Sequence, residues 1–215
     1  MDSEDPLTPQ AFQEQSGVSR ETQARLEAYV ALLRKWNRRI NLVSRASLED
    51  VWRRHVLDSS QLMAYLPPAP SGRPRVLLDL GSGAGLPGLV LAILGAGEVH
   101  LVEADGRKAA FLREAARVAE TEVRVHACRI EAVNSFDVDV VTSRALAPLP
   151  RLLALAEPFL GPETRCLFLK GAGVEAELEA ARSAWDFSME SHPSCTYCSG
   201  NILLIGVSGR GTTAS

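Results

Sequence analysis

The chain has 215 residues, 46% of them hydrophobic and 23% charged, with a formal net charge of −3 at pH 7. This composition is that of an ordinary soluble globular protein with one sizeable core. No apolar run approaches the ~18 residues that span a bilayer, and residues 1–5 lack the order of a signal peptide. We therefore expect a cytoplasmic protein without membrane contact. Because the net charge is negative, any nucleic-acid footprint must be local.

The first 72 residues predict a helical cap. Thr8 followed by Pro9 starts a short helix, and Ser19 caps a longer one. Ser47 opens another helical stretch, which ends in the proline-rich run 67–72, where we place a domain boundary. The longer helix is expected to bury one apolar face, which consists of Leu26, Tyr29, Val30, Leu33 and Ile40.

From residue 75 short apolar or β-branched runs alternate with helical segments. Strands are expected at 76–80, 99–103, 123–127, 136–142 and 166–169, with helices at 88–94, 107–119, 149–160 and 174–185. This alternation predicts an α/β fold with a doubly wound parallel sheet and right-handed crossovers. The last two strands, 187–192 and 202–207, have no helix between them and predict a closing antiparallel hairpin. The second domain is thus expected at 73–208, followed by a tail at 209–215.

The first strand runs into a glycine turn with the spacing Asp79-x-Gly81-x-Gly83-x-Gly85, and a helix follows from Gly88. Such a turn offers backbone N–H groups to a ligand, and glycine lets the main chain approach that ligand closely. A dinucleotide fingerprint reads G-x-G-x-x-G, which differs from this spacing. The motif instead resembles the first motif of class I methyltransferases, which bind S-adenosylmethionine. A tight turn without any ligand is the alternative.

Residues at the carboxyl ends of the later strands are the next candidates, because ligands of open α/β sheets bind there. Glu103 can accept hydrogen bonds from two ribose hydroxyls, or it is simply a solvated carboxylate. Ile130 and Glu131 suit an adenine ring and its amino group. Arg144 is a bidentate donor for a methionine carboxylate or a phosphate, with a structural salt bridge as the alternative. Residues 142–145 lack the Asn-Pro-Pro-Tyr-like sequence associated with amine methylation.

Several stretches together resemble one family, the bacterial 16S ribosomal RNA guanine-N7 methyltransferases, or glucose-inhibited division protein B family. They are residues 35–42, 54–59, 79–88, 106–112, 142–145 and 169–171. The resemblance implies a class I methyltransferase (Rossmann-like) fold, S-adenosylmethionine as cofactor, and methylation of N7 of one guanine in the decoding region. It also implies 16S ribosomal RNA or the small ribosomal subunit as the partner, and we expect a monomer. By position, the family's cofactor contacts fall on Gly81, Leu86, Ile130, Glu131 and Arg144.

The match to the family has departures. Leu86 stands where Phe is common, and Glu103 stands where Asp is usual. The segment after His192 does not match. There Cys195 and Cys198 form a C-x-x-C, but no second pair completes a structural zinc site, so we expect reduced thiols and no metal. Metal or redox use is the alternative. Four cysteines in a domain of this size predict no disulfide framework.

The chemistry of guanine N7 explains the absence of a candidate acid–base pair. N7 carries a free lone pair at neutral pH, so no base has to deprotonate it, and we nominate no catalytic acid–base residue. Holding sulfur, methyl and N7 in line is the main task, and orientation can contribute ~7–11 kcal/mol. Because N7 faces the deep groove of an RNA helix, the target must lie in a loop or be turned out.

The cap supplies the local basic footprint expected for RNA, although a solvated helix face is the plain alternative. Its members are Arg34, Lys35, Arg38, Arg39, Arg54 and His55. Two rival functions stay open at this point. One is a class I methyltransferase that acts on a small molecule, and the other is a non-catalytic cofactor- or ribosome-binding module.

Overall fold

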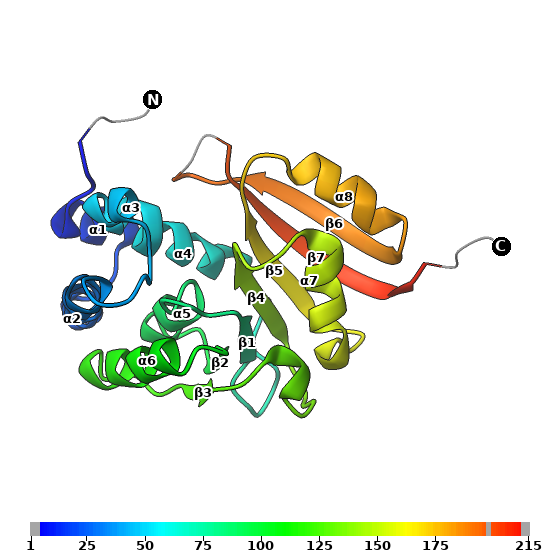
Figure 1. The fold of residues 1–215 in the computed structure, drawn as a ribbon, viewed down its shortest axis with the longest axis horizontal. Helices are drawn as coiled ribbons and strands as arrows, with labels where there is room; N and C mark the ends of the chain where they lie inside the picture. Colours follow the sequence, from blue (N-terminus) through cyan, green and yellow to red (C-terminus); the bar gives the residue numbers. More distant parts are fainter. Residues whose placement is uncertain (1–4, 197–198, 212–215) are drawn as a thin grey trace.

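The computed structural model describes residues 5–196 and 199–211, and within them seven strands form one mixed sheet (Figure 1). The strand order is β3-β2-β1-β4-β5-β7-β6; β1 to β5 are parallel, and β7 is antiparallel to both β5 and β6. The predicted doubly wound sheet with a closing hairpin is therefore confirmed. The strands are β1 (Val76–Leu80), β2 (Glu98–Val102), β3 (Arg124–His126), β4 (Val140–Arg144), β5 (Arg165–Lys170), β6 (Trp185–Pro193) and β7 (Asn201–Arg210).

Helices cover both faces of the sheet because neighbouring residues of a strand point to opposite sides. Leu77 belongs to a core cluster with the cap, α5 and α6, whereas Leu78 belongs to a second cluster with α7 and α8. No helix of the described ranges is both long and apolar enough to cross a membrane. The helices of the sheet domain are α5 (Gly88–Ile93), α6 (Gly106–Val118), η3 (Ile130–Ala132), α7 (Leu149–Ala156), η4 (Glu157–Phe159) and α8 (Val174–Arg182).

The cap begins with α1 (Pro9–Ser16) and α2 (Arg20–Asn37), which Thr8 and Ser19 cap through their side-chain oxygens as predicted. Leu26, Tyr29, Val30 and Leu33 are buried, but Ile40 lies beyond the end of α2. The buried Tyr29 hydroxyl donates a hydrogen bond of 2.8 Å to the carbonyl of Ala84 in the glycine turn. The cap therefore shares one core with the sheet rather than packing loosely beside it.

The third part of the cap differs from the prediction. Ser44, not Ser47, caps α3 (Arg45–Glu49), because its hydroxyl oxygen accepts a hydrogen bond from the Ser47 N–H. The helix then breaks at Asp50, whose carboxylate accepts a hydrogen bond from the Leu7 N–H. A π-helical turn, η1 (Trp52–Leu57), leads into α4 (Asp58–Ser60) and the 3₁₀ turn η2 (Gln61–Tyr65). Single π-helical turns such as η1 are frequent at functional sites.

Further boundaries were wrong. The helix expected at 174–185 ends at Arg182, and Trp185 already begins β6. Strand β4 begins at Val140 rather than at 136, and the half-buried Phe136 ring before it stacks on His100 with ring centroids 4.3 Å apart. The expected tail at 209–215 begins too early, since β7 runs to Arg210. The Arg210 side chain forms an ion pair with Glu157 and stacks over the Trp185 ring, which holds the end of the strand.

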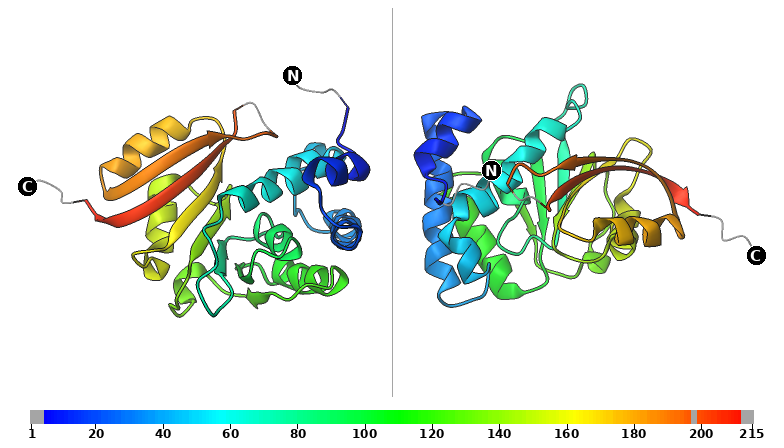
Figure 2. Two further views of the ribbon diagram at one scale, coloured as in Figure 1. Left: turned by 180° about the vertical axis from the view of Figure 1, so that it is seen from behind. Right: turned by 90° about the horizontal axis from the view of Figure 1, so that it is seen from above.

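The β6–β7 hairpin reaches back to the cap, as two views of the molecule show (Figure 2). At its tip the Thr196 hydroxyl donates a hydrogen bond of 2.7 Å to Asp58, and the Cys195 N–H donates one of 3.1 Å to Gln61. Residues far apart in the sequence therefore meet beside the carboxyl ends of β4 and β5.

Candidate cofactor and substrate site

The glycine turn after β1 adopts backbone angles that favour glycine. Gly81 has φ +69°, and a Cβ there would lie 2.6 Å from Leu146 Cδ1. Gly85 has φ +86°, and a Cβ there would lie 2.7 Å from Leu89 Cβ. The turn therefore packs closely against Leu146 and Leu89, and its half-buried Gly81 and Gly83 line the pocket at the carboxyl end of the sheet.

Glu103 lies directly against this turn. Glu103 is only 9% exposed. Oε2 accepts a hydrogen bond of 2.9 Å from the Gly83 N–H, and Oε1 accepts one of 2.8 Å from the Asp105 N–H. Each carboxylate oxygen has a second lone pair. The carboxylate is thus oriented by backbone and can still accept two hydroxyl donors.

A pocket of about 360 Å³ opens between the glycine turn, the end of β2 and the segments after β3 and β4. Six of the seven predicted cofactor residues line it, namely Gly81, Gly83, Glu103, Ile130, Glu131 and Arg144. Leu86 does not; it is buried in the core behind the turn. Lys108, Cys128 and Leu146 also line the pocket, although the sequence analysis assigned none of them to the cofactor.

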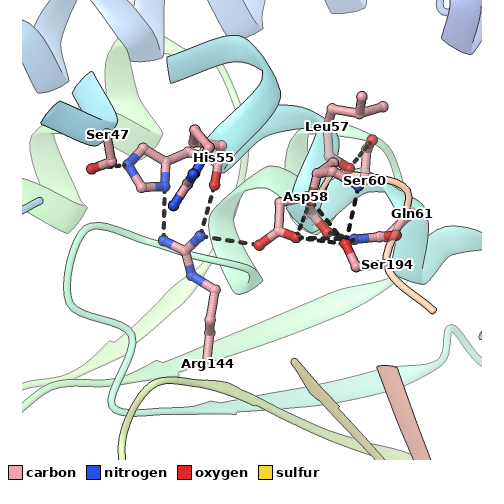
Figure 3. Close-up of polar contacts among 10 residues, drawn as sticks. Ser47, His55, Leu57, Asp58, Ser60, Gln61, Arg144 and Ser194 are labelled. Carbon is pink, nitrogen blue, oxygen red and sulfur yellow. Dashed lines mark hydrogen bonds and ion pairs between the residues drawn. The ribbon is translucent and has the colours of Figure 1, made fainter. Parts of the chain in front are cut away.

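Arg144 stands at the end of β4 and is held by the cap (Figure 3). Nη1 donates to the Arg54 carbonyl at 3.1 Å and pairs with Asp58 Oδ2 at 3.2 Å, while Nη2 donates to His55 Nδ1 at 3.0 Å. The salt bridge considered as an alternative for Arg144 is therefore present. Arginine has five N–H donors, so these contacts leave two for a ligand.

A second pocket, of about 550 Å³, adjoins the first. The two share Arg144, Ala145 and Leu146, and Leu146 is the large apolar side chain that is most exposed among the described residues, at 37%. Elements of the cap, the segment after β4, the end of β5 and the hairpin tip enclose it. The polar side chains that line it are Ser47, Arg54, His55, Asp58, Arg144, Lys170, Glu177, Ser194, Thr196 and Asn201.

The segment between the pockets is held in an unusual conformation. Ala145 has φ +53°, a left-handed angle that costs a non-glycine residue roughly 1–2 kcal/mol. Lys170 Nζ donates to the Ala147 carbonyl at 2.9 Å and pairs with Glu177 at 2.6 Å. Glu177 in turn accepts from the Leu149 N–H at 2.7 Å. Backbone strain that the surroundings maintain in this way is typical of functional sites.

A family model described as GidB, rRNA small subunit methyltransferase G, matches residues 22–205. The chain belongs to this family. The ribosomal RNA small subunit methyltransferase G of Rhodospirillum rubrum is 58% identical over 200 residues, covering 93% of this chain and 98% of that protein. The protein of the same name from Paramagnetospirillum magneticum is 52% identical over 205 residues, covering 95% and 98%. The expected family is therefore confirmed, and the protein is a methyltransferase.

Solved structures support the fold of this methyltransferase. A mutant of MtNAS in complex with S-adenosylmethionine aligns with a TM-score of 0.58 at 15% identity, covering 94% of this chain and 84% of that one. A TehB-like SAM-dependent methyltransferase from Corynebacterium glutamicum aligns with a TM-score of 0.53 at 18% identity, covering 70% and 87%. At such low identities the alignments concern the fold alone. They confirm the class I methyltransferase fold.

The basic residues predicted for RNA fall into two groups in the methyltransferase. Arg34, Lys35, Arg38 and Arg39 are exposed at the carboxyl end of α2, and Arg54 is exposed at the rim of the second pocket. His55 differs, because it is only 6% exposed and both ring nitrogens have partners inside the protein. Burial, together with the charges of Arg144 and Arg54, lowers its pKa to about 3. His55 therefore adds no positive charge to the basic surface.

Of the C-x-x-C pair, Cys195 belongs to the described residues and Cys198 lies outside them. Cys195 is exposed, and its side chain forms no disulfide. In the part of the chain that the structure describes, no group of three or more His, Cys, Asp or Glu residues could hold a metal ion.

Asp79 is the buried acid of the glycine motif. The Thr142 hydroxyl donates to its Oδ1 at 2.8 Å, but Oδ2 has no hydrogen-bond partner. Burial raises the pKa of Asp79 to about 6, although Ser82, Thr142, the Gly88 backbone and the Arg144 charge act in the opposite direction. Asp79 is fully buried and does not line the pocket, so its carboxylate lies beneath the glycine turn rather than in the site.

Asp79 should make the folded protein less stable as the pH rises. The ordinary pKa of Asp79 is 3.8, and in the folded protein it is about 6. Between these two pH values the folded state keeps a proton that the unfolded state has released. The free energy of unfolding therefore declines through this window, by about 2 kcal/mol from pH 4.5 to 7. Asp79→Asn keeps the acceptor for Thr142 and does not titrate. Urea unfolding across this range should show a shallower decline for the variant, and parallel curves would contradict the assignment.

Proposed function

We propose that this protein transfers the methyl group of S-adenosylmethionine to N7 of one guanine in the decoding region of 16S ribosomal RNA. Membership of the family confirms the expected enzyme class, an S-adenosylmethionine-dependent methyltransferase of small-subunit ribosomal RNA. The observation that carries the rest is the pair of adjoining pockets that share Arg144, Ala145 and Leu146. One pocket has the chemistry for the cofactor, and the other opens towards the basic cap.

The first pocket fits the cofactor group by group. Glu103 accepts from the ribose hydroxyls, and Ile130 packs on the adenine ring while Glu131 accepts from its amino group. The two remaining N–H groups of Arg144 serve the carboxylate at the amino acid end of the cofactor. When bound, the cofactor supplies an electrophilic methyl group on a sulfonium. We assign Gly81 and Gly83 to close backbone contact and Leu86 to support from the core.

The second pocket holds the target nucleotide in this proposal. Its rigid wall, the segment from Ala145 to Leu149, is fixed by Lys170 and Glu177, and Leu146 offers an apolar surface to the base. The N7 lone pair attacks the methyl carbon directly, so no residue has to accept a proton. The protein contributes by holding the two reactants in line and by excluding water, and orientation alone can supply ~7–11 kcal/mol.

We assign the cap, residues 1–72, to RNA docking and residues 73–208 to cofactor binding. The exposed Arg34, Lys35, Arg38, Arg39 and Arg54 lead from α2 to the second pocket and offer cations to the phosphate backbone. One copy of the chain contributes both pockets, so a monomer suffices. From the ribosomal substrate we infer a cytoplasmic location.

Replacing Arg38 and Arg39 together with alanine should weaken RNA binding and its salt dependence. Both side chains are exposed, so the loss concerns RNA rather than folding. Two lost phosphate contacts reduce the slope of log K against log salt by about 1.4 for single-stranded RNA. The measurement is the affinity for the small subunit at several salt concentrations.

A matched control removes the same charge at the opposite end of the sheet. Arg113 and Arg117 are exposed on α6 beside the amino end of β2, away from both pockets. Their double replacement by alanine should leave the salt slope unchanged. Equal slopes for both double variants and the wild type would remove the RNA-docking role from the end of α2.

The function itself is tested with small subunits from a strain that lacks this protein. They are incubated with the protein and radiolabelled S-adenosylmethionine, and the RNA is cleaved with aniline to reveal 7-methylguanine. We expect label at one guanine. Cofactor binding without label in RNA would overturn the proposal in favour of a small-molecule substrate or a non-catalytic role.

A further inference from the structure

A series of hydrogen bonds, centred on the buried His55, runs from the cap to the half-buried Arg144 (Figure 3). The Ser47 hydroxyl donates to the Ser44 carbonyl at 3.0 Å. His55 Nε2 lies 3.0 Å from the same Ser47 oxygen, and His55 Nδ1 lies 3.0 Å from Arg144 Nη2. The series joins the amino end of α3 to the junction of the two pockets.

Only one direction of these hydrogen bonds satisfies every group. A guanidinium has no acceptor, so Arg144 donates, and His55 Nδ1 must present its lone pair. The single proton of the neutral ring then lies on Nε2 and is donated to Ser47. The Ser47 hydroxyl can accept it, because its own proton is directed to the Ser44 carbonyl. The cap thereby selects one tautomer of His55.

The charges around His55 support the neutral ring. Arg144 and the exposed Arg54 lie close to it, and Asp58 is the acid that pairs with Arg144. Asp58 also accepts from Thr196 at 2.7 Å through its other oxygen, so its place is fixed by the hairpin tip. Arg144 is therefore held from two sides, by a carboxylate on Nη1 and by an imidazole lone pair on Nη2.

We propose that His55 is a positioning residue, whose unprotonated Nδ1 orients the Arg144 guanidinium so that its remaining N–H groups face the carboxylate of the cofactor. Ser47 acts one step further away by keeping the proton on Nε2. This inference rests on the proposed function, because it concerns the contact of Arg144 with the cofactor. It gives His55 a role in place of the RNA contact expected from its neighbours in the sequence.

Two near-isosteres separate this role from simple packing. Asparagine places Oδ1 where histidine has Nδ1, so His55→Asn keeps the acceptor for Arg144 and loses the contact with Ser47. Glutamine reaches the position of Nε2, so His55→Gln keeps a partner for Ser47 and removes the acceptor for Arg144. Both substitutions remove the ring, and thermal unfolding shows whether the two variants are equally folded.

The readouts are the affinity for S-adenosylmethionine by calorimetry and the kcat/KM of rRNA methylation. We expect His55→Asn to stay within about threefold of the wild type and His55→Gln to lose about tenfold or more in both, the order expected for one hydrogen bond to a charged group. Equal losses in the two variants, or none in either, would overturn the positioning role. A wild-type protein that binds cofactor but does not methylate RNA would overturn the proposed function, and calorimetry would still decide the role of His55.

Nitrogen NMR of the wild-type protein gives a test that needs no substitution. At pH 7 the ring should be neutral with Nδ1 unprotonated and Nε2 protonated. A proton on Nδ1 would contradict the proposal directly, because that nitrogen could not then accept from Arg144.

Discussion

Arg144→Ala should lower the kcat/KM of rRNA methylation at least about a hundredfold. The substitution removes the cation at the junction of the two pockets and the donors left for the cofactor carboxylate. Each hydrogen bond between charged groups contributes about 1.5–3 kcal/mol, so the loss of two accounts for a change of this size. Steady-state kinetics with small subunits, together with calorimetry of cofactor binding, measure it.

The fold should survive this change. Asp58 keeps the donors Gln61 and Thr196 at Oδ1, so only its Oδ2 loses a partner. Arg144→Lys is the informative companion, because lysine keeps the charge but lacks the planar fork that reaches His55 and Asp58 together. We expect it to recover less than a tenth of the lost activity. Unchanged kinetics and cofactor affinity for Arg144→Ala would remove this residue from the site.

Glu103→Ala should weaken the binding of S-adenosylmethionine about 30- to 100-fold. Two ribose hydroxyls lose their acceptor, and the N–H groups of Gly83 and Asp105 lose the carboxylate that aligns them with the glycine turn. The effect should lie in cofactor affinity, with kcat at saturating cofactor changed much less, because Glu103 is assigned no contact with the reacting atoms. Calorimetry and the cofactor KM together separate these quantities.

Glu103→Asp is the conservative variant, because the resemblance places aspartate here in most members of the family. It should retain most of the affinity. Glu122→Ala is a matched control, since this exposed glutamate lies at the amino end of the sheet, beside the groove that Arg113 and Arg117 line. Equal affinities of Glu103→Ala and Glu122→Ala would mean that Glu103 is a solvated carboxylate without a ribose contact.

The local elements could be predicted from the sequence to a large extent. The caps Thr8 and Ser19, the strand Val76–Leu80 and the glycine turn all depend on residues within a few positions of one another. Ser44 was missed because two serines compete three residues apart, and the break at Asp50 depends on a contact with Leu7. Strand β7 was expected to end too early because Arg210 finds Glu157 and Trp185 only in the folded chain.

The candidate site was likewise predictable from the sequence only in part. The order of strands brings their carboxyl ends to one edge, so six of seven predicted cofactor residues meet in one pocket. The burial of His55, the contact of Asp58 with Thr196, and the second pocket depend on residues up to 138 positions apart. The sequence by itself thus determined the sheet, the turn and the family. Only the tertiary structure decided which polar groups of the cap hold Arg144, because such contacts follow from the packing of distant segments and leave no periodic pattern along the chain.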